Sequence, residues 1–300
     1  MRFKKISVLF NPIAGQGKGE KLALHYRSIL NALGYVVTVS ESLPFYSPAQ
    51  ASSLLEMQDL LIVSGGDGTL RPLLPFLAQT KIPVYMAPSG NESLFAKLFK
   101  MNGDMKSLLQ TLNNGVIEHH YFANANGSPF FHMTSIGFDA EVVKSISCDR
   151  SGPIRHRGYL KPMLKALLSH RAPRLTITVD GDKKIVETTG YCIIANSPAY
   201  ALRIPLAKGA NSAERALRGY FYPMKKGWNF FLLAVVALLF KSTRLWKSIP
   251  LNGSTITITS ESDSQSPVQA DGDFIGTTPV NIQKSEACVS VLVSKQKNSY

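Results

Sequence analysis

The stretch of sequence that decides the fold is LLIVSGGDGT, residues 60–69, in which an apolar run passes directly into a glycine-rich turn. A helical pattern begins near Leu70, so the turn joins a predicted strand to a predicted helix. Glycines let backbone N–H groups approach an anion closely, and the following helix adds unpaired donors and the positive end of its dipole. Asp67 adds a carboxylate where a phosphate-bound Mg²⁺ would need one. The pattern favours a phosphate site, and an ordinary tight turn is the simpler alternative.

Short apolar runs alternate with helical patterns through the first 120 or so residues. Such alternation predicts a parallel sheet covered by helices. Loops with special chemistry follow three of the strands, at 11–19, 64–69 and 88–91, and in an open parallel sheet these loops lie at one edge and line one crevice. The predicted strands are 6–10, 36–39, 60–63 and 84–87, and the predicted helices are 20–33, 48–57, 70–79 and 92–99.

From about Phe122 the pattern changes to short alternating runs broken by turn signals such as Asp180-Gly181. This pattern predicts a second, mostly antiparallel β domain with a few helices. We therefore divide the chain into an α/β domain over 1–122 and a β-rich domain over 123–286, while the last strand or tail, 287–300, can pack on either one. The predicted strands of the second part are 175–179, 191–195, 219–222, 255–259 and 289–293, with a serine-rich loop at 260–266.

The charge balance points to anionic partners. The chain has 33 Lys and Arg against 20 Asp and Glu, a net charge of +13, which suits nucleotide phosphates, nucleic acid or an acidic membrane surface. Its hydrophobic content of 45% is sufficient for one large core or two ordinary ones. Cys148, Cys192 and Cys288 are far apart and lack metal-ligand spacing, so we expect plain thiols in a reduced, cytoplasmic setting.

Two apolar segments bear on membrane association. The first, 6–10, is only as long as a strand and meets Asn11-Pro12, so it is not a signal peptide. The second, 228–240, would span roughly 20 Å as a helix against roughly 30 Å of bilayer core, so it cannot cross a membrane. Burial in the second domain is the first expectation for this segment, and partial contact with an anionic membrane is the next, because cations flank it. They are Lys225, Lys226, Lys241, Arg244 and Lys247, and a second basic group spans 150–174.

Two further segments carry candidate chemistry. The loop NPIAGQGKG, residues 11–19, combines three glycines with Lys18 and suits a second phosphate contact, although it lacks the Gly-Lys-Ser/Thr of a Walker loop. The turn Asp271-Gly272-Asp273 carries two carboxylates, and Asp-Gly is also a standard hairpin pair. The histidines show no convincing ligand spacing, so we expect surface or core roles for them.

Taken in order, four motifs resemble those of lipid kinases with a diacylglycerol kinase catalytic domain. They are the loop beginning Asn11-Pro12, the GGDGT turn at 65–69, the segment FHMTSIGFDA at 131–140 and VQADGD at 268–273. The resemblance spans nearly the whole chain. It implies ATP-dependent, Mg²⁺-assisted transfer of a phosphoryl group to a lipid hydroxyl. It also implies a Rossmann-like α/β nucleotide-binding domain, a β-sandwich lipid-substrate domain and a nucleotide cleft between them.

The resemblance also implies roles for individual residues. Asp67 would act through Mg²⁺, and Asp271 would accept the proton of the lipid hydroxyl as the catalytic base. A carboxylate suffices for that task, since phosphoryl transfer depends mostly on positioning and charge neutralisation. The residues that would contact the nucleotide are Asn11, Gly15, Lys18, Gly65, Gly66, Asp67, Gly68, Thr69, Gly90 and Asn91.

Three departures from the family pattern stand out. Where relatives have Gly-Thr-x-Asn, this chain has Gly90-Asn91-Glu92-Ser93, whose polar side chains have different lengths. Where many relatives have Asp-Asp-Gly, which can contribute to a structural Mg²⁺ site, this chain has residues 213–215, AER, so we predict no second metal site. The late turn ends in Asp273 where relatives commonly have Glu.

The leading hypothesis is a cytoplasmic kinase that phosphorylates diacylglycerol or a related lipid at the inner membrane surface. A kinase of a soluble hydroxyl substrate is the second, because NAD kinases also carry a Gly-Gly-Asp-Gly-Thr turn; Asp271-Gly272 and the Asn11-Pro12 loop favour the lipid. A degenerate protein that binds nucleotide or acidic lipid is the third, supported by the altered loop at 90–93. Nucleic-acid binding is not expected, since the basic segments lack aromatic interleaving. The sequence indicates neither the acceptor lipid nor an oligomeric state.

Overall fold

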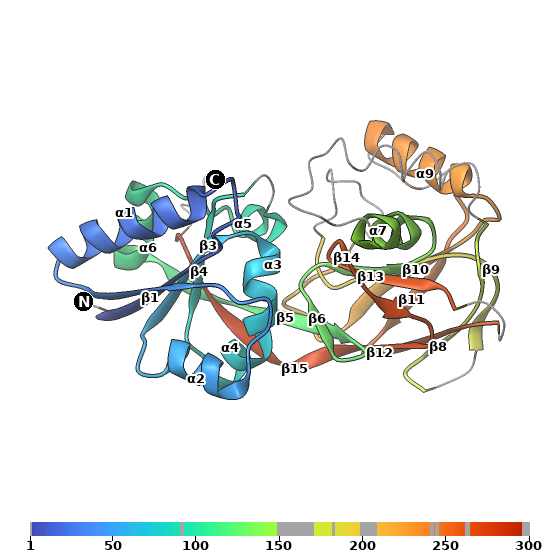
Figure 1. Cartoon of the computed structure of the whole chain (residues 1–300). Coiled ribbons are helices and arrows are strands. Elements are labelled where there is room, and N and C mark those ends of the chain that lie inside the picture. The colour runs from blue at the N-terminus through green and yellow to red at the C-terminus, as the bar shows by residue number, and fades with distance from the viewer. Residues whose placement is uncertain are drawn as a thin grey trace, which may run out of the picture. The chain divides into compact units, whose positions relative to one another are not determined.

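The computed structural model describes residues 2–90, 93–148, 171–181, 184–198, 209–240, 243, 246–261 and 265–295. The chain divides into two compact units, Met1–His120 with Ala287–Tyr300, and Tyr121–Glu286 (Figure 1). The first unit is a parallel α/β layer structure and the second is mostly antiparallel β, which confirms the predicted fold class. Outside the described residues lie Asn91, Lys241, Arg244 and the part of the basic group between 150 and 165.

The sheet of the first unit has the order β15-β4-β3-β1-β2, and its strands are parallel. At the centre, β3 is buried along its whole length, because strands flank it on both sides and helices cover both faces, which explains its uninterrupted apolar sequence. The strands are β1 (Lys5–Phe10), β2 (Val36–Glu41), β3 (Leu60–Gly65), β4 (Val84–Pro88) and the end of β15 (Val280–Val293).

Helices lie on both faces of this sheet. Figure 1 shows α1 and α2 on opposite faces, and α2 contacts α4. Three helices begin at capping side chains, Ser47 at α2, Ser93 at α5 and Asp104 at α6, which accept bonds from the third backbone N–H of the helix. The helices are α1 (Lys18–Ala32), α2 (Pro48–Leu55), α4 (Leu74–Thr80), α5 (Leu94–Leu98) and α6 (Met105–Asn114).

The single helix predicted over 70–79 is instead three short elements. The helix α3 (Asp67–Leu70) is followed by a 3₁₀ turn, Arg71–Leu73, and then by α4. Pro72 and Pro75 sit at the starts of the second and third elements, where a residue without an N–H interrupts the hydrogen-bond ladder least. Helical structure therefore begins three residues earlier than expected, and Asp67, Gly68 and Thr69 form its first turn.

The second unit contains strands that pair almost entirely antiparallel, in the order β14-β13-β7-β9-β8-β12-β15, with β10 between β9 and β11. The long strand β9 changes partners at Gly190, from β8 to β7 and β10. It thereby links two sheets. The strands are β5 (Val116–Ala125), β6 (Ser128–Phe130), β7 (Met133–Ile136), β8 (Arg174–Val179), β9 (Lys184–Ala195), β10 (Leu217–Pro223), β11 (Ile249–Gly253), β12 (Thr255–Ser260), β13 (Pro267–Ala270) and β14 (Asp273–Thr277).

Two hydrophobic clusters stabilise the second unit. One joins inward side chains of β8 and β12, such as Ile177 and Ile258, to those of β7 and β9, such as Ile136 and Ile194, as in a β-sandwich. The other fills the space between strands and the helices α7 (Phe138–Cys148) and α9 (Gly227–Phe240), which lie side by side over the strands in Figure 1. No helix within the described ranges is long and apolar enough to cross a membrane.

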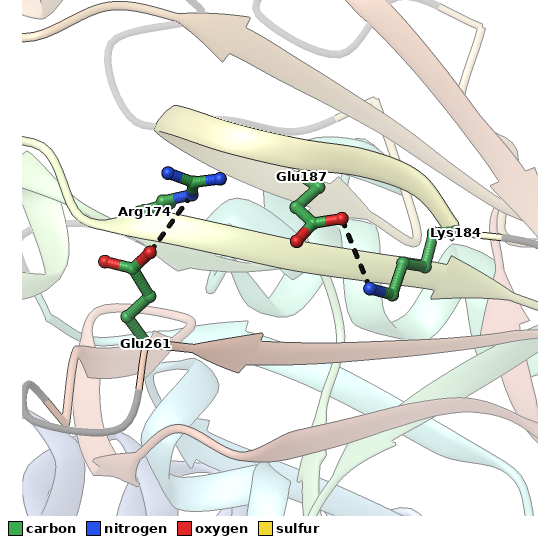
Figure 2. Close-up of polar contacts among 4 residues, drawn as sticks. All are labelled: Arg174, Lys184, Glu187 and Glu261. Atoms are coloured by element: carbon green, nitrogen blue, oxygen red, sulfur yellow. Dashed lines mark hydrogen bonds and ion pairs between the residues drawn. The ribbon is translucent and has the colours of Figure 1, made fainter.

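Ion pairs on the surface of the second unit contribute little to its stability. Figure 2 shows Arg174 bridging to Glu261 and Lys184 bridging to Glu187, both with N–O distances of 3.2 Å. All four side chains are more than half exposed, and such pairs typically stabilise by less than about 1 kcal/mol. The two hydrophobic clusters therefore dominate the stability of this unit.

Candidate active site

Backbone hydrogen bonds tie three loops together at the carboxyl edge of the parallel sheet. After β1, the Asn11 N–H donates to the Ser64 carbonyl at 3.1 Å, and after β4, the Ser89 N–H donates to the Gly65 carbonyl at 3.3 Å. The Ser64 hydroxyl donates to the Gly19 carbonyl at 2.9 Å. The chain leaves β1 toward β2 on one side and returns to β3 on the other, so these loops flank the point where ligands bind in open α/β sheets.

The predicted glycines of this edge fall into two groups. Gly15 has φ +57, and a Cβ there would lie 1.9 Å from the Ser89 carbonyl oxygen, while a Cβ on Gly65 would lie 2.5 Å from the Thr69 hydroxyl oxygen. Close packing therefore explains these two. Gly68 and Gly90 are exposed, and a Cβ on either would meet no atom of the described residues within 4 Å. The surface beside them is open to a ligand.

Asn11 and Thr69 contact each other. The Asn11 Nδ2 donates to the Thr69 hydroxyl at 3.2 Å, and the Asn11 Oδ1 accepts the Ile13 N–H at 3.1 Å. Thr69 is buried, whereas Lys18 is exposed at the first position of α1. The structure thus gives Asn11 and Thr69 a role in loop shape and leaves Lys18 accessible.

Both oxygens of the Asp67 carboxylate point at the start of α5. Oδ1 accepts the Ser93 hydroxyl at 2.7 Å, Oδ2 accepts the Leu94 N–H at 2.9 Å, and the Phe95 N–H is shared between them at 3.2 and 3.3 Å. A carboxylate has about four acceptor sites, so these donors occupy nearly all of them. Sequence reasoning did not connect Ser93 to Asp67. The position of Ser93 before the apolar residues 94–96 marks it as a helix cap and gives no sign of that contact.

Asp271 lies in the tight turn of the β13–β14 hairpin. Asp271 and Gly272 have φ of +48 and +85, the pair of left-handed residues that a two-residue hairpin turn requires. Its carboxylate accepts three consecutive backbone N–H groups: Phe131 to Oδ2 at 2.6 Å, and His132 and Met133 to Oδ1 at 2.9 and 3.0 Å. The hairpin turn therefore also fixes a carboxylate.

The surroundings of Asp271 determine both the pKa of its carboxyl group and how far another group can reach that carboxyl group. Burial raises the pKa of its carboxyl group, while the nearby His132 and the three backbone N–H donors lower that pKa in part. Among the described residues, three donors leave one of about four acceptor sites, on Oδ2, for another group. The side chain is only partly exposed. This is the form of carboxylate that can accept a proton from a hydroxyl.

A second group of polar side chains holds the Asp271–Gly272 turn in place through hydrogen bonds. The Gln269 Oε1 accepts the Gly272 N–H at 2.9 Å, and its Nε2 donates to the Ser135 hydroxyl at 2.6 Å. Ser135 in turn donates to the Asp139 carboxylate at 2.5 Å. Burial raises the pKa of Asp139.

Backbone carbonyl groups in the segment Phe131–Met133 accept hydrogen bonds as well. The Asn196 Nδ2 donates to the Phe131 carbonyl at 2.7 Å, and the Asn196 N–H donates to the His132 carbonyl at 2.7 Å. The ammonium group of Lys284 donates to the Asn196 Oδ1. Both side chains are buried. Sequence reasoning missed Lys284 although a signal was present, because it alternates with Val280 and Ile282 on the buried face of β15.

No group of three or more His, Cys, Asp or Glu side chains within the described ranges is arranged to hold a metal ion. Glu214, in the segment compared with the second metal site of relatives, accepts the Asn211 Nδ2 at 3.2 Å and lies 3.7 Å from Arg218. These contacts give Glu214 a local structural role.

The chain is similar in sequence and in fold to known proteins. Residues 5–124 match the sequence profile of the diacylglycerol kinase catalytic domain. A diacylglycerol kinase of Mycobacterium tuberculosis is 24% identical, with 96% of this chain and 94% of that protein aligned. An uncharacterised protein of Synechocystis is 25% identical over 92% of this chain and 67% of its own length. The fold resembles a crystal structure of a diacylglycerol kinase from Bacillus anthracis, with a TM-score of 0.67, 18% identity and 98% of both chains aligned.

These findings define the class of protein as a lipid kinase. Within that class, residues 5–124 carry the similarity to the diacylglycerol kinase catalytic domain. The resemblance predicted from the four motifs is thereby confirmed.

Proposed function

We propose that the protein transfers the γ-phosphoryl group of ATP, with Mg²⁺, to a hydroxyl group of diacylglycerol or a related lipid. The observation that carries this proposal is the Asp271 carboxylate, which three backbone N–H groups hold and to which the described residues leave one acceptor site, on Oδ2. Asp271 would accept the hydroxyl proton as the oxygen attacks phosphorus. Its raised pKa brings it nearer the working pH than that of an ordinary aspartate.

The open edge of the parallel sheet would bind the nucleotide phosphates. Gly68 and Gly90 offer backbone without a covering side chain, and the exposed Lys18 adds a cation. Mg²⁺ commonly keeps several waters and needs only one or two protein carboxylates. Asp67 would hold the ion, and the donors of α5 that bind its carboxylate would orient it. The bound ion would neutralise charge on the transferred phosphoryl group.

The exposed face of α9 would bring the enzyme to its lipid. Gly227, Phe230, Leu233 and Ala237 face the core, while Trp228, Phe231, Leu232, Leu239 and, at the helix end, Phe240 are exposed. Lys225, Lys226 and Lys247 beside the helix are also exposed. Apolar side chains next to cations suit peripheral binding to an anionic membrane.

The proposal is tested with purified protein, γ-labelled ATP and mixed vesicles containing diacylglycerol and anionic lipid. We expect labelled phospholipid that disappears on chelation of Mg²⁺ and returns when Mg²⁺ is added. Asp271→Asn should lower kcat by roughly 10²- to 10⁴-fold, and it should fold, because asparagine tolerates the left-handed backbone of this turn.

Two results would overturn the proposal. Product formed from NAD without vesicles would assign a soluble acceptor, and ATP binding without transfer to any member of a panel of lipids would assign a regulatory binding role. Full activity of Asp271→Asn would remove Asp271 from the reaction while leaving the lipid acceptor in place.

A further inference from the structure

We propose that Lys284 and Asn196 are positioning residues for Asp271, linked to its carboxylate by a continuous relay of hydrogen-bonded amide groups. The inference rests on the proposed role of Asp271 and extends it to two residues of the second unit that do not contact the carboxylate themselves.

The relay passes through whole peptide groups. The Lys284 ammonium donates to the Asn196 Oδ1, and the Asn196 Nδ2 donates to the Phe131 carbonyl at 2.7 Å. The other end of that same peptide group is the His132 N–H, which donates to the Asp271 Oδ1 at 2.9 Å. Every donor along this path therefore points toward the carboxylate.

A second branch has the same direction. The Asn196 N–H donates to the His132 carbonyl at 2.7 Å, and the Met133 N–H of that peptide group donates to the Asp271 Oδ1 at 3.0 Å. Two parallel paths thus run from Asn196 to one oxygen of Asp271. Hydrogen bonds in a chain polarise one another, and they do so most strongly at low local dielectric.

Burial makes the relay an unusual arrangement. Asn196 is fully buried and Lys284 is 8% exposed, and burial lowers the pKa of Lys284 to about 8. A buried ammonium destabilises a fold unless it is paired and bonded, so a lysine here needs a compensating role. Its position at the start of the relay supplies one, since a positive charge there strengthens the His132 N–H donor at the end of the path through the Asn196 side chain.

Other titratable groups lie near the relay among the described residues. Glu214 faces Lys284 and favours its charged form, and His132 lies beside Asp271 and lowers its pKa. Asp139 reaches the turn through Ser135 and Gln269. The test therefore compares variants at Lys284 with these groups unchanged.

The decisive measurement is the titration of the Asp271 carboxyl carbon by NMR in the full chain, with Asp271→Asn identifying the resonance. Lys284→Met removes the charge and the donor but keeps the length of the side chain. We expect the Asp271 titration to move upward by roughly one pH unit. The acid limb of kcat for lipid phosphorylation should move in the same direction, with the KM for lipid unchanged.

Lys284→Gln is the second variant, because its amide keeps a hydrogen-bond donor. It can be used if the Lys284→Met protein does not fold. It should shift the titration upward by less. The matched control is Lys184→Met, an exposed lysine paired with Glu187, which should leave the titration of Asp271 unchanged.

An unchanged Asp271 titration in a folded Lys284 variant would overturn the relay, and a variant that loses only thermal stability would assign Lys284 a purely structural role. These outcomes are independent of catalysis. If the wild-type protein phosphorylates no lipid, the proposed function fails, while the titration still decides whether the relay exists.

Discussion

At the scale of single residues, two carboxylates that look equivalent in the sequence are held differently. Asp67 and Asp271 both precede a glycine in a tight segment. Donors at the start of α5 occupy the Asp67 oxygens, whereas the described residues leave Asp271 one acceptor site. Asp67 therefore orders the start of α5 in its own unit, and in the proposed reaction Asp271 is the better proton acceptor of the two.

Removing the Ser93 hydroxyl tests the ordering role of Asp67. Ser93 donates to the Asp67 Oδ1 and accepts the Ala96 N–H at 3.1 Å. Ser93→Ala should lower the free energy of unfolding by about 1 kcal/mol through the lost cap. It should also raise the KM for ATP, because the loop between β4 and α5 loses one of its ties to Asp67.

Ser47→Ala is the matched control, since Ser47 caps α2 through a capping box with Gln50. It should lower stability by a similar amount and leave the KM for ATP unchanged, as measured by denaturant unfolding and initial-rate kinetics. Equal KM values in the two variants would argue against a link between Ser93 and the nucleotide edge.

Lys284 predicts a dependence of stability on pH. Its pKa is about 8 in the folded chain against 10.5 for an ordinary lysine, so between these values the unfolded chain holds more protons. Stability from this group therefore rises as pH rises from about 8 to 10.5, by roughly 3 kcal/mol in all. Below pH 8 the buried charge of Lys284 lowers the free energy of unfolding, and Lys284→Met removes that charge.

Denaturant unfolding of the wild type and Lys284→Met at pH 7 and pH 10 measures this effect. The wild type should gain stability relative to the variant over that interval. A difference between the two proteins that stays constant with pH would mean that Lys284 titrates normally.

At the scale of elements, the sequence predicted those structures that neighbouring residues determine by themselves. The β3 strand and its glycine turn were predictable, because an apolar run and glycines determine them without distant partners. The contact of Ser93 with Asp67 depends on the parallel register of β3 and β4, in which Gly65 lies opposite Pro88. Asn196 likewise reaches Phe131 only because β7 pairs with β9. Neither of these strand registers can be predicted from a short stretch of sequence.

The exposed side of α9 predicts membrane binding that depends on a few side chains. Leu239 and Phe240 are 69% and 71% exposed, and complete burial of such a side chain is favourable by roughly 1.5–3 kcal/mol. Replacing both with serine should weaken binding to anionic vesicles by at least about tenfold. The unfolding midpoint should change little, because exposed side chains make few contacts within the fold.

Phe45→Ser is the control, because Phe45 is 83% exposed in the first unit and is not part of α9. It should leave vesicle affinity unchanged in a sedimentation assay. If the double serine variant binds vesicles as tightly as the wild type, α9 is not the contact surface.

At the scale of the whole molecule, the chain returns to its first unit at its end. The strand β15 begins in the second unit, beside β12, and its last residues pair in parallel with β4, Val291 opposite Val84. The apolar run 289–293 predicted a strand but not its neighbours, since an edge of either sheet would accept it. The first unit is therefore built from two separated pieces of sequence.

This arrangement predicts that the first unit cannot fold without the end of the chain. A chain ending at Glu286 loses Val289, Val291, Leu292 and Val293, all almost completely buried. At roughly 1.5–3 kcal/mol each, their burial amounts to about 6–12 kcal/mol, comparable with the whole stability of a typical domain. We expect the truncated chain to lose the near-ultraviolet circular dichroism and the cooperative unfolding of the first unit. A chain ending at Lys295 keeps all four side chains and should unfold like the full-length protein, and a cooperative transition of the first unit in the shorter chain would contradict the prediction.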